Sequence, residues 1–165
     1  MKWFVLIMIG CSTVWGLTIG QVPQAIVLKD ALVSGGDWHS SRLKDKICVV
    51  FYVDPDEKNI NDDFSKILKK SRLKLSVSVI VNMKSTWIPK FLITKGLKKE
   101  QEKEKDILFI MDNERTLIKK WGLKDDYSSI LIFGDGGKLI YQFVGKMKKK
   151  EIDKVMSLVN IAFSK

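Results

Sequence analysis

The sequence predicts an α/β protein with three layers, in which helices flank a central mixed sheet. Short runs of β-branched and aromatic residues alternate with amphipathic segments, a pattern typical of parallel strands joined by helices. A glycine-rich turn then joins two further strands into a hairpin, and a last amphipathic segment closes the chain. The length of 165 residues fits one domain with a short appendage.

The appendage is predicted to be a signal peptide over residues 1–16. Lys2 supplies a short positive region, and an apolar run follows it. Val14 and Gly16 are small enough for the positions that signal peptidase recognises, so we expect cleavage after Gly16. A single domain would then occupy residues 17–165, and the protein would be periplasmic.

Cys11 supports a second interpretation of the same segment. Ile9-Gly10-Cys11 resembles the end of a bacterial lipobox, in which the cysteine becomes a lipid-modified N-terminus, although Met8 replaces the usual leucine. Cleavage after Gly16, or a few residues later, would instead leave Cys48 as the one cysteine of the mature chain. An internal disulfide would then be impossible, and stability would have to come from the core.

The first part of the mature chain is expected to hold a hairpin, a strand and a helix. Residues 26–33 alternate enough for a short hairpin, and residues 38–43 are interpreted as a linker or turn. The continuous β-branched and aromatic run Ile47–Val53 predicts a strand buried on both faces. Asn59 or Asn61 can cap the following helix. The apolar stripe of that helix consists of Ile60, Phe64, Ile67 and Leu68.

The middle of the chain repeats the alternation of strand and helix. Residues 75–81 predict a second strand, and residues 89–105 predict a helix that begins at a proline and breaks near Gly96. Residues 107–111 predict a third strand, followed by a short helix or turn over residues 117–123. Asp112-Asn113-Glu114, between these two elements, is expected to form a turn or a helix cap.

The end of the chain predicts an antiparallel hairpin and a closing helix. Residues 129–133 and 138–144 form the two strands, and Gly134-Asp135-Gly136-Gly137 supplies the residues that a tight turn needs. Residues 148–163 then place apolar side chains on one helical face.

Two local patterns resemble the thioredoxin fold. The strand Ile47–Val53, followed by Asp54-Pro55-Asp56, resembles the strand that delivers the thioredoxin active-site turn. Residues 128–139 resemble the strand, turn and strand that end such domains. Within this superfamily, residues 18–163 are similar to the YtfJ-type family of exported bacterial proteins. The motifs that carry this similarity are Val81-Asn82, Ile107–Asp112, Trp121 with Leu123, and Ser128–Ile132.

The chain departs from active thioredoxins at the turn itself. Disulfide exchange needs a low-pKa thiolate and a resolving thiol three residues on. The aligned turn is Asp56-Glu57-Lys58-Asn59, and Ser128 stands where the neighbouring cis-proline would be. We therefore expect a redox-inactive protein, without a cofactor, that binds an envelope protein or a small ligand. The resemblance implies a binding face made of Asp54, Pro55, Asp56, Glu57, Asn59, Tyr127 and Ser128.

Cys48 carries the alternative that the protein is a single-cysteine, thiol- or peroxide-reactive enzyme. It lies in a buried strand, where a cysteine usually acts as a small apolar residue with a raised pKa. His39 is the only histidine and does not make a transition-metal site alone. The acidic cluster over residues 54–63 lacks the glycine and the spacing of a calcium loop, so we expect no metal.

The charge pattern bears on the remaining partner classes. Lys and Arg total 29 against 19 Asp and Glu, for a net charge of +10. Only three of the basic residues are arginines. Because arginine is the side chain that best recognises bases and phosphates, this balance does not favour nucleic-acid binding. A basic nucleic-acid-binding regulator is therefore the least favoured alternative. Weak contact with an anionic membrane surface or an acidic partner fits the lysine excess better. Trp38, Trp87 and Trp121 are expected in the core or a groove, and an exposed Trp87 beside Pro89 would indicate an interaction surface.

Overall fold

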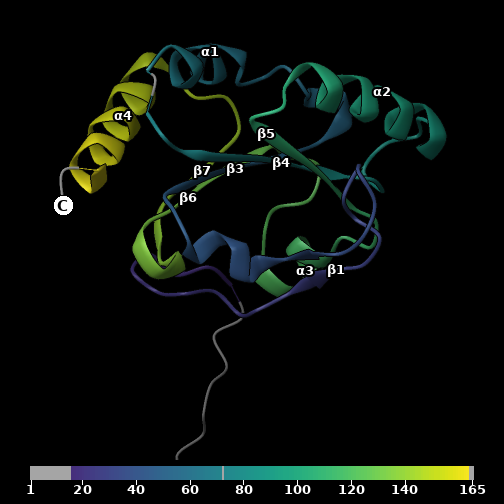
Figure 1. The fold of residues 1–165 in the computed structure, drawn as a ribbon, viewed down its shortest axis with the longest axis horizontal. Coiled ribbons are helices and arrows are strands. Elements are labelled where there is room, and N and C mark those ends of the chain that lie inside the picture. The colour runs from purple at the N-terminus through teal and green to yellow at the C-terminus, as the bar shows by residue number, and fades with distance from the viewer. Residues whose placement is uncertain (1–15, 72, 164–165) are drawn as a thin grey trace, which may run out of the picture.

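The computed structural model describes residues 16–71 and 73–163, which form a central five-stranded sheet between two outer layers (Figure 1). The order across the sheet is β5-β4-β3-β6-β7. β3, β4 and β5 run parallel, whereas β6 is antiparallel to β3 and β7 is antiparallel to β6. The strands are β3 (Cys48–Val53), β4 (Ser76–Asn82), β5 (Ile107–Asp112), β6 (Ser129–Phe133) and β7 (Leu139–Val144). This arrangement confirms the predicted three-layer sandwich.

Three helices cover one face of the sheet, and the smaller elements cover the other (Figure 1). The sheet steps in one direction from β3 to β4 to β5, so crossovers of the same hand place both connecting helices on the same face. The first layer is α1 (Asp62–Lys70), α2 (Lys90–Lys103) and α4 (Lys149–Phe163). The second is α3 (Thr116–Trp121), β1 (Val27–Leu28), β2 (Trp38–His39) and the 3-10 helix η1 (Ser40–Lys44).

β3 lies at the centre of both cores and is buried along its whole length, as predicted. Its side chains alternate between the faces because successive residues of a strand point to opposite sides. Cys48, Val50 and Tyr52 pack in the cluster that contains Trp38 and Trp121. The intervening residues of the strand pack in the second cluster, beneath α1 and α4.

The helices of the first layer are not equally well packed. α1 buries Phe64 and Leu68, and α4 buries three of its residues. None of the fourteen residues of α2 is fully buried, although Ile93 and Leu97 pack partly against the sheet. α2 is therefore the least anchored helix of the layer. Among the described helices, none combines the length and apolar character that crossing a bilayer requires.

The N-terminal hairpin forms with a different partner strand from the one predicted. Val27 and Leu28 pair with Trp38 and His39, in the segment interpreted as a linker, whereas Leu32 bridges Ile110 at the edge of the main sheet. The prediction of a hairpin within residues 26–33 was wrong because residues 29–37 form a long turn between the two paired strands. An ion pair between Lys29 and Asp37 spans that turn at 2.7 Å.

Two expectations about the helices were also wrong in detail. α2 runs through Gly96 without the predicted break, since a glycine inside a helix costs only about 1 kcal/mol relative to alanine and does not end it. Asn61 holds the N-cap position of α1, yet its side chain makes no capping bond. Its Nδ2 instead donates to the carbonyl of Gly145, and its Oδ1 accepts from the N–H of Met147 at 2.8 Å.

Candidate functional site

The predicted binding face assembles where β3 ends and β6 begins. The backbone N–H of Asp54 donates to the Ser128 hydroxyl oxygen at 3.3 Å. In return, the backbone N–H of Ser128 donates to the Glu57 carboxylate, also at 3.3 Å. These reciprocal bonds join segments more than seventy residues apart in the sequence, so the turn after β3 and the residue before β6 form one structural unit.

The turn after β3 is a short 3-10 helix, η2 (Pro55–Glu57). Pro55 occupies its first turn, where the fixed φ of proline suits a helix start. Asp54 caps it, because its carboxylate accepts the N–H of Asp56 at 2.9 Å. The Thr86 hydroxyl, from the loop after β4, donates to the Asp56 carboxylate at 3.0 Å. The turn is thus fixed from both sides. Asp56 and Glu57 belong to this short helix and not to α1, which begins five residues after Glu57.

Asp54 is a buried acid within this unit. Burial raises the pKa of the Asp54 carboxyl above its ordinary value, and the negative charges of Asp56 and Asp126 act in the same direction. The hydrogen bond from the Asp56 backbone and one from the Ser85 side chain oppose that rise in pKa. Its carboxyl therefore serves the turn and is not presented to solvent.

The exposed part of the face consists of Asp56, Asn59 and Tyr127. Tyr127 is 42% exposed, and the ammonium of Lys124 lies 3.7 Å from its ring centroid. A cation over the face of an aromatic ring is attracted to it and stabilises the position of the ring. The face thus presents a carboxylate, an amide and a phenol around a rigid, buried base.

A hollow of about 380 Å³ adjoins the face between α1 and α2. Glu57, Asn59 and Ser128 are among the residues that line it. Val77, Val79 and Val81 of β4 also line it, on the sheet face that the helices cover, and give it an apolar floor. The loose packing of α2 leaves this space open beside the candidate face.

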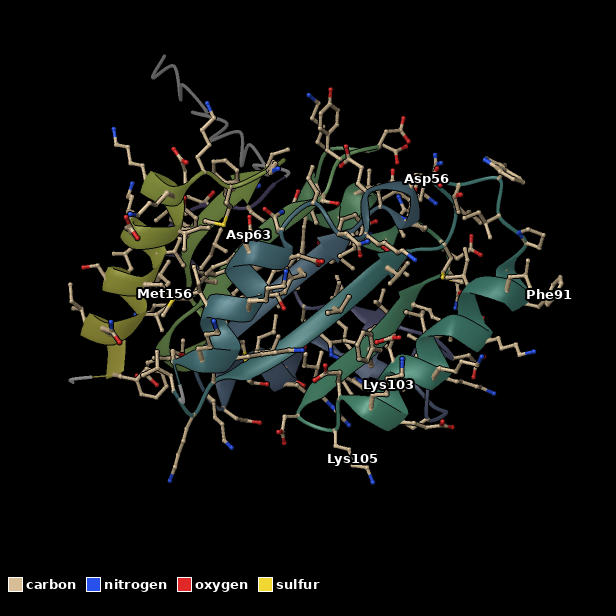
Figure 2. All side chains as sticks on the ribbon, turned by 90° about the horizontal axis from the view of Figure 1, so that it is seen from above. Asp56, Asp63, Phe91, Lys103, Lys105 and Met156 are labelled. Atoms are coloured by element: carbon tan, nitrogen blue, oxygen red, sulfur yellow. The ribbon has the colours of Figure 1, made fainter. Side chains whose placement is uncertain are left out.

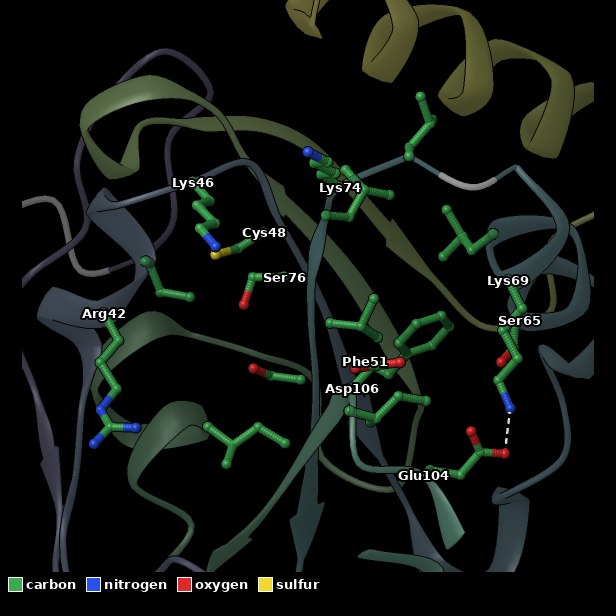
Figure 3. Close-up of a pocket in the computed structure, with 18 of the residues that line it drawn as sticks. Arg42, Lys46, Cys48, Phe51, Ser65, Lys69, Lys74, Ser76, Glu104 and Asp106 are labelled. Atoms are coloured by element: carbon green, nitrogen blue, oxygen red, sulfur yellow. Dashed lines mark hydrogen bonds and ion pairs between the residues drawn. The ribbon is translucent and has the colours of Figure 1, made fainter.

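A larger hollow of about 930 Å³ lies toward the amino ends of the same strands (Figure 3). Lys69 and Glu104 pair at 2.5 Å and line both hollows. Cys48 and Ser76 belong to the wall of the larger one, with Lys46 nearby in Figure 3. The two hollows therefore lie next to each other, but the thiol belongs to the one farther from the candidate face.

Cys48 is 2% exposed and begins the strand at whose far end Asp54 lies. Burial raises the pKa of the Cys48 thiol, which disfavours the thiolate. His39 lies exposed on β2. Within residues 16–71 and 73–163, no group of three or more histidine, cysteine or acidic side chains is arranged to hold a metal ion.

A polar network at the same edge of the sheet was not predicted as part of the site. Asp112, fully buried at the end of β5, accepts the N–H groups of Thr116 at 2.8 Å and Leu117 at 2.9 Å. It also accepts the N–H of Glu114 and the Tyr52 hydroxyl, which confirms the expected turn or cap. Burial, followed by the charge of Asp112, strongly raises the pKa of Tyr52.

The network continues through Asn82, which ends β4 in register with Asp112. The Asn82 amide donates to Asp125 at 3.2 Å, and Arg115 pairs with the other oxygen of Asp125 at 2.9 Å. Arg115 also donates to the carbonyl of Lys84. The signal that could have found this network is the presence of a polar residue at the end of each parallel strand, since such ends meet at one edge.

The predicted signal segment lies almost entirely outside the described residues, and so does Cys11. The described chain begins at Gly16. Leu17, the first residue after the predicted cleavage point, donates its N–H to the carbonyl of Trp121 at 3.1 Å and packs partly against the core. The fold therefore includes the chain from this residue onward.

Comparison with known proteins places this geometry in a family. Residues 18–162 match the model of a family described as a bacterial protein of unknown function, YtfJ_HI0045. An uncharacterised protein of Haemophilus influenzae is 25% identical over 142 residues, which are 79% of this chain and 77% of that one.

Solved structures resemble the chain at lower identity. A candidate thiol:disulfide interchange protein DsbE from Chlorobium tepidum has a TM-score of 0.65 at 13% identity, covering 89% of this chain and 99% of that chain. The exposed lipoprotein thioredoxin Etrx1 from Streptococcus pneumoniae has a TM-score of 0.57 at 17% identity, covering 82% and 99%. These likenesses show the fold alone. The chain therefore belongs to the YtfJ family of bacterial proteins and has a thioredoxin-like fold.

Proposed function

We propose that this protein is an exported, redox-inactive thioredoxin-like protein that binds a partner in the cell envelope. The observation that carries the proposal is the turn Asp56–Asn59. The turn contains no cysteine, and the resemblance to thioredoxins aligns it with their cysteine pair. Both of its carboxylates are already engaged, Asp56 by Thr86 and Glu57 by the backbone of Ser128. A turn so firmly held is suited to presenting a fixed surface.

The chemistry of the face limits what it can bind. Carboxylate and amide groups around the hollow favour a partner that offers hydrogen-bond donors or positive charge. The apolar floor of β4 favours an apolar group next to those donors, and 380 Å³ lies within the range of about 300–1,000 Å³ typical of ligand sites. A small ligand or one anchoring side chain of an envelope protein fits both features.

The proposal of export is supported by the sequence of residues 1–16 and by the description of one structurally similar protein. One structurally similar protein is described as an exposed lipoprotein. The intact mass of the protein from fractionated source cells tests this part of the proposal. A start at Leu17 in the soluble envelope fraction supports it, and a lipid-modified start at Cys11 supports the lipoprotein alternative. A full-length cytosolic protein would overturn export.

Photocrosslinking in the source cells tests the binding role. A photoreactive amino acid replaces Asn59 or Tyr127 on the face, and Lys46, which is exposed near the opposite end of β3, is the matched control position. We expect one defined adduct from the face positions, absent from the Lys46 position and weakened by Asp56→Ala. Identical adducts from all three positions would contradict a specific face.

The thiol enzyme remains the second candidate function, but no structural observation favours it. The burial of Cys48 and the raised pKa of its thiol both oppose nucleophilic attack at neutral pH. Peroxide-dependent sulfenylation of the native protein would restore this candidate.

A further inference from the structure

An exposed apolar cluster lies at the beginning of α2, outside the site described above. Trp87 is 88% exposed and Phe91 is 68% exposed, with Leu92 and Pro89 exposed beside them. Figure 2 shows Phe91 projecting away from the body of the molecule, at the opposite end of α2 from Lys103. We call these four residues, with Lys90, Lys95 and Lys98, the α2 patch.

The α2 patch does not serve the stability of the fold. Its two aromatic side chains are largely exposed, whereas Trp38 and Trp121 are buried. Pro89 occupies the N-cap position of α2 without a capping side chain, and the first turn contains no acidic residue. Lys90 instead places a positive charge at the helix start, where the helix dipole disfavours it. The exposed aromatic rings and the uncapped helix start therefore contribute little to the stability of the fold.

The charge of the α2 patch has a single sign. Residues 87–99 contain four lysines and no acidic residue, and the first glutamate of the helix is Glu100. Phe91, Lys95 and Lys98 are spaced four and then three residues apart, so they share one outward helical face. Together with Lys90 and Thr94 they line one shallow depression of the surface. An aromatic tip surrounded by flexible lysines is the composition of a segment that lies in a membrane interface.

We propose that the α2 patch binds the surface of an anionic phospholipid bilayer. Trp87 and Phe91 enter the headgroup region, and the lysines reach the lipid phosphates while their aliphatic stems cover apolar surface. A bilayer suits this patch better than a protein does, because the patch projects outward and presents only apolar and basic side chains. The contact is peripheral, and it does not rest on the proposed function.

Docking by the α2 patch would also orient the molecule. Trp87 directly follows Thr86, whose hydroxyl is bonded to Asp56 of the candidate binding face. The bilayer would therefore lie beside that face and not at the end of the sheet where Cys48 lies.

The test uses the protein recovered from its source cells, mixed with vesicles of phosphatidylcholine alone or with phosphatidylglycerol, both with brominated acyl chains. Trp87 is the one exposed tryptophan of the described chain, so in protein that starts at Leu17 its quenching reports insertion of the patch. We expect quenching and co-sedimentation with the anionic vesicles only, weakened by added salt. The double variant Trp87→Ser, Phe91→Ser should bind about tenfold or more weakly.

The matched control is Ile161→Ser, which removes an apolar side chain that is 57% exposed on α4. It should bind as the unchanged protein does, and both variants should unfold at the same temperature as the unchanged protein. If the double variant still binds the anionic vesicles as well as the unchanged protein does, the contact is made by basic residues outside the patch and the proposal is overturned. Absence of vesicle binding would also overturn it, and a blue shift of Trp87 on adding an envelope protein fraction would then assign the patch to a protein partner.

Discussion

The two ends of β3 differ in a way that bears directly on function. At its amino end, Cys48 lies in the wall of a large hollow, is nearly inaccessible and has a raised thiol pKa. At its carboxyl end, Asp54 and the turn that follows it are bonded to Ser128 and Thr86 and present exposed polar groups. The strand thus separates a buried, protected thiol at one end from an exposed polar surface at the other.

This difference shows what remains of a thioredoxin-like scaffold when the cysteine pair is absent. The carboxyl edge still gathers side chains from β3, β4, β5 and the start of β6, because the topology brings those strand ends together. Its function then depends on which groups it fixes and exposes. The following predictions test the two ends, from the largest expected effect to the smallest.

The largest effect is expected at the carboxyl edge, from Asp112→Ala. This change leaves three backbone N–H groups and the Tyr52 hydroxyl without their buried acceptor. We expect the free energy of unfolding to fall by about 3 kcal/mol or more, measured by denaturant titration. Tyr52→Phe is the control, because it removes one long bond and should cost about 1 kcal/mol. Equal effects of the two changes would show that Asp112 does not organise the edge.

At the amino end, we predict that the Cys48 thiol is protected in the folded protein. Its reaction with a thiol reagent at neutral pH should be at least about 100-fold slower than in the unfolded chain, because the thiol must wait for an opening of the structure. The comparison is made by absorbance in native buffer and in denaturant. Equal reaction rates in the folded and the unfolded protein would show that the Cys48 thiol is accessible, and the contrast between the two ends of β3 would not hold.

A smaller effect is expected from Ser128→Ala, which removes the hydroxyl that accepts the Asp54 N–H. Leaving this backbone donor without a partner should cost about 1 kcal/mol of unfolding free energy. Ser157→Ala on the exposed side of α4 is the matched control and should cost almost nothing. A loss of stability as small as that of the control would mean that the reciprocal bonds do not hold the face together.

The smallest effect is expected in the pH dependence that Asp54 contributes. Its folded pKa lies above the ordinary value of 3.8, so the folded state favours the protonated carboxyl. Stability from this group is fully present below pH 3.8 and is lost as the pH rises through the folded pKa. Wild type should therefore lose stability relative to Asp54→Asn across that window, measured by thermal unfolding. If wild type instead gained stability relative to Asp54→Asn as the pH rises, the pKa of Asp54 would be lowered and not raised by folding.

The sequence predicts the elements with strong local signals. The buried run of β3, the strands around the Gly134–Gly137 turn and the amphipathic α4 all form within one or two residues of their predicted bounds. The short β2 was missed because two residues carry no periodic pattern, and its pairing depends on the burial of Trp38. The predicted break at Gly96 was wrong because the packing of Ile93 and Leu97 outweighs the low helix propensity of glycine.

The site could be predicted only where the resemblance to a fold supplied its location. That resemblance brought Asp54, Glu57 and Ser128 to one place, and the structure joins them by hydrogen bonds. The bond from Thr86 to Asp56 and the pair of Arg115 with Asp125 link distant loops. Nothing in the local sequence specifies which loop meets which, so these contacts emerge only from the tertiary structure.

The central claim is that the protein acts through its carboxyl edge without thiol chemistry. The most direct test is the rate at which the purified protein reduces a disulfide substrate, measured beside Cys48→Ala and a dithiol thioredoxin as the active reference. We predict that the protein and Cys48→Ala both match the rate without added protein. A rate clearly above that background, lost in Cys48→Ala, would place the function at the other end of β3 and contradict the account.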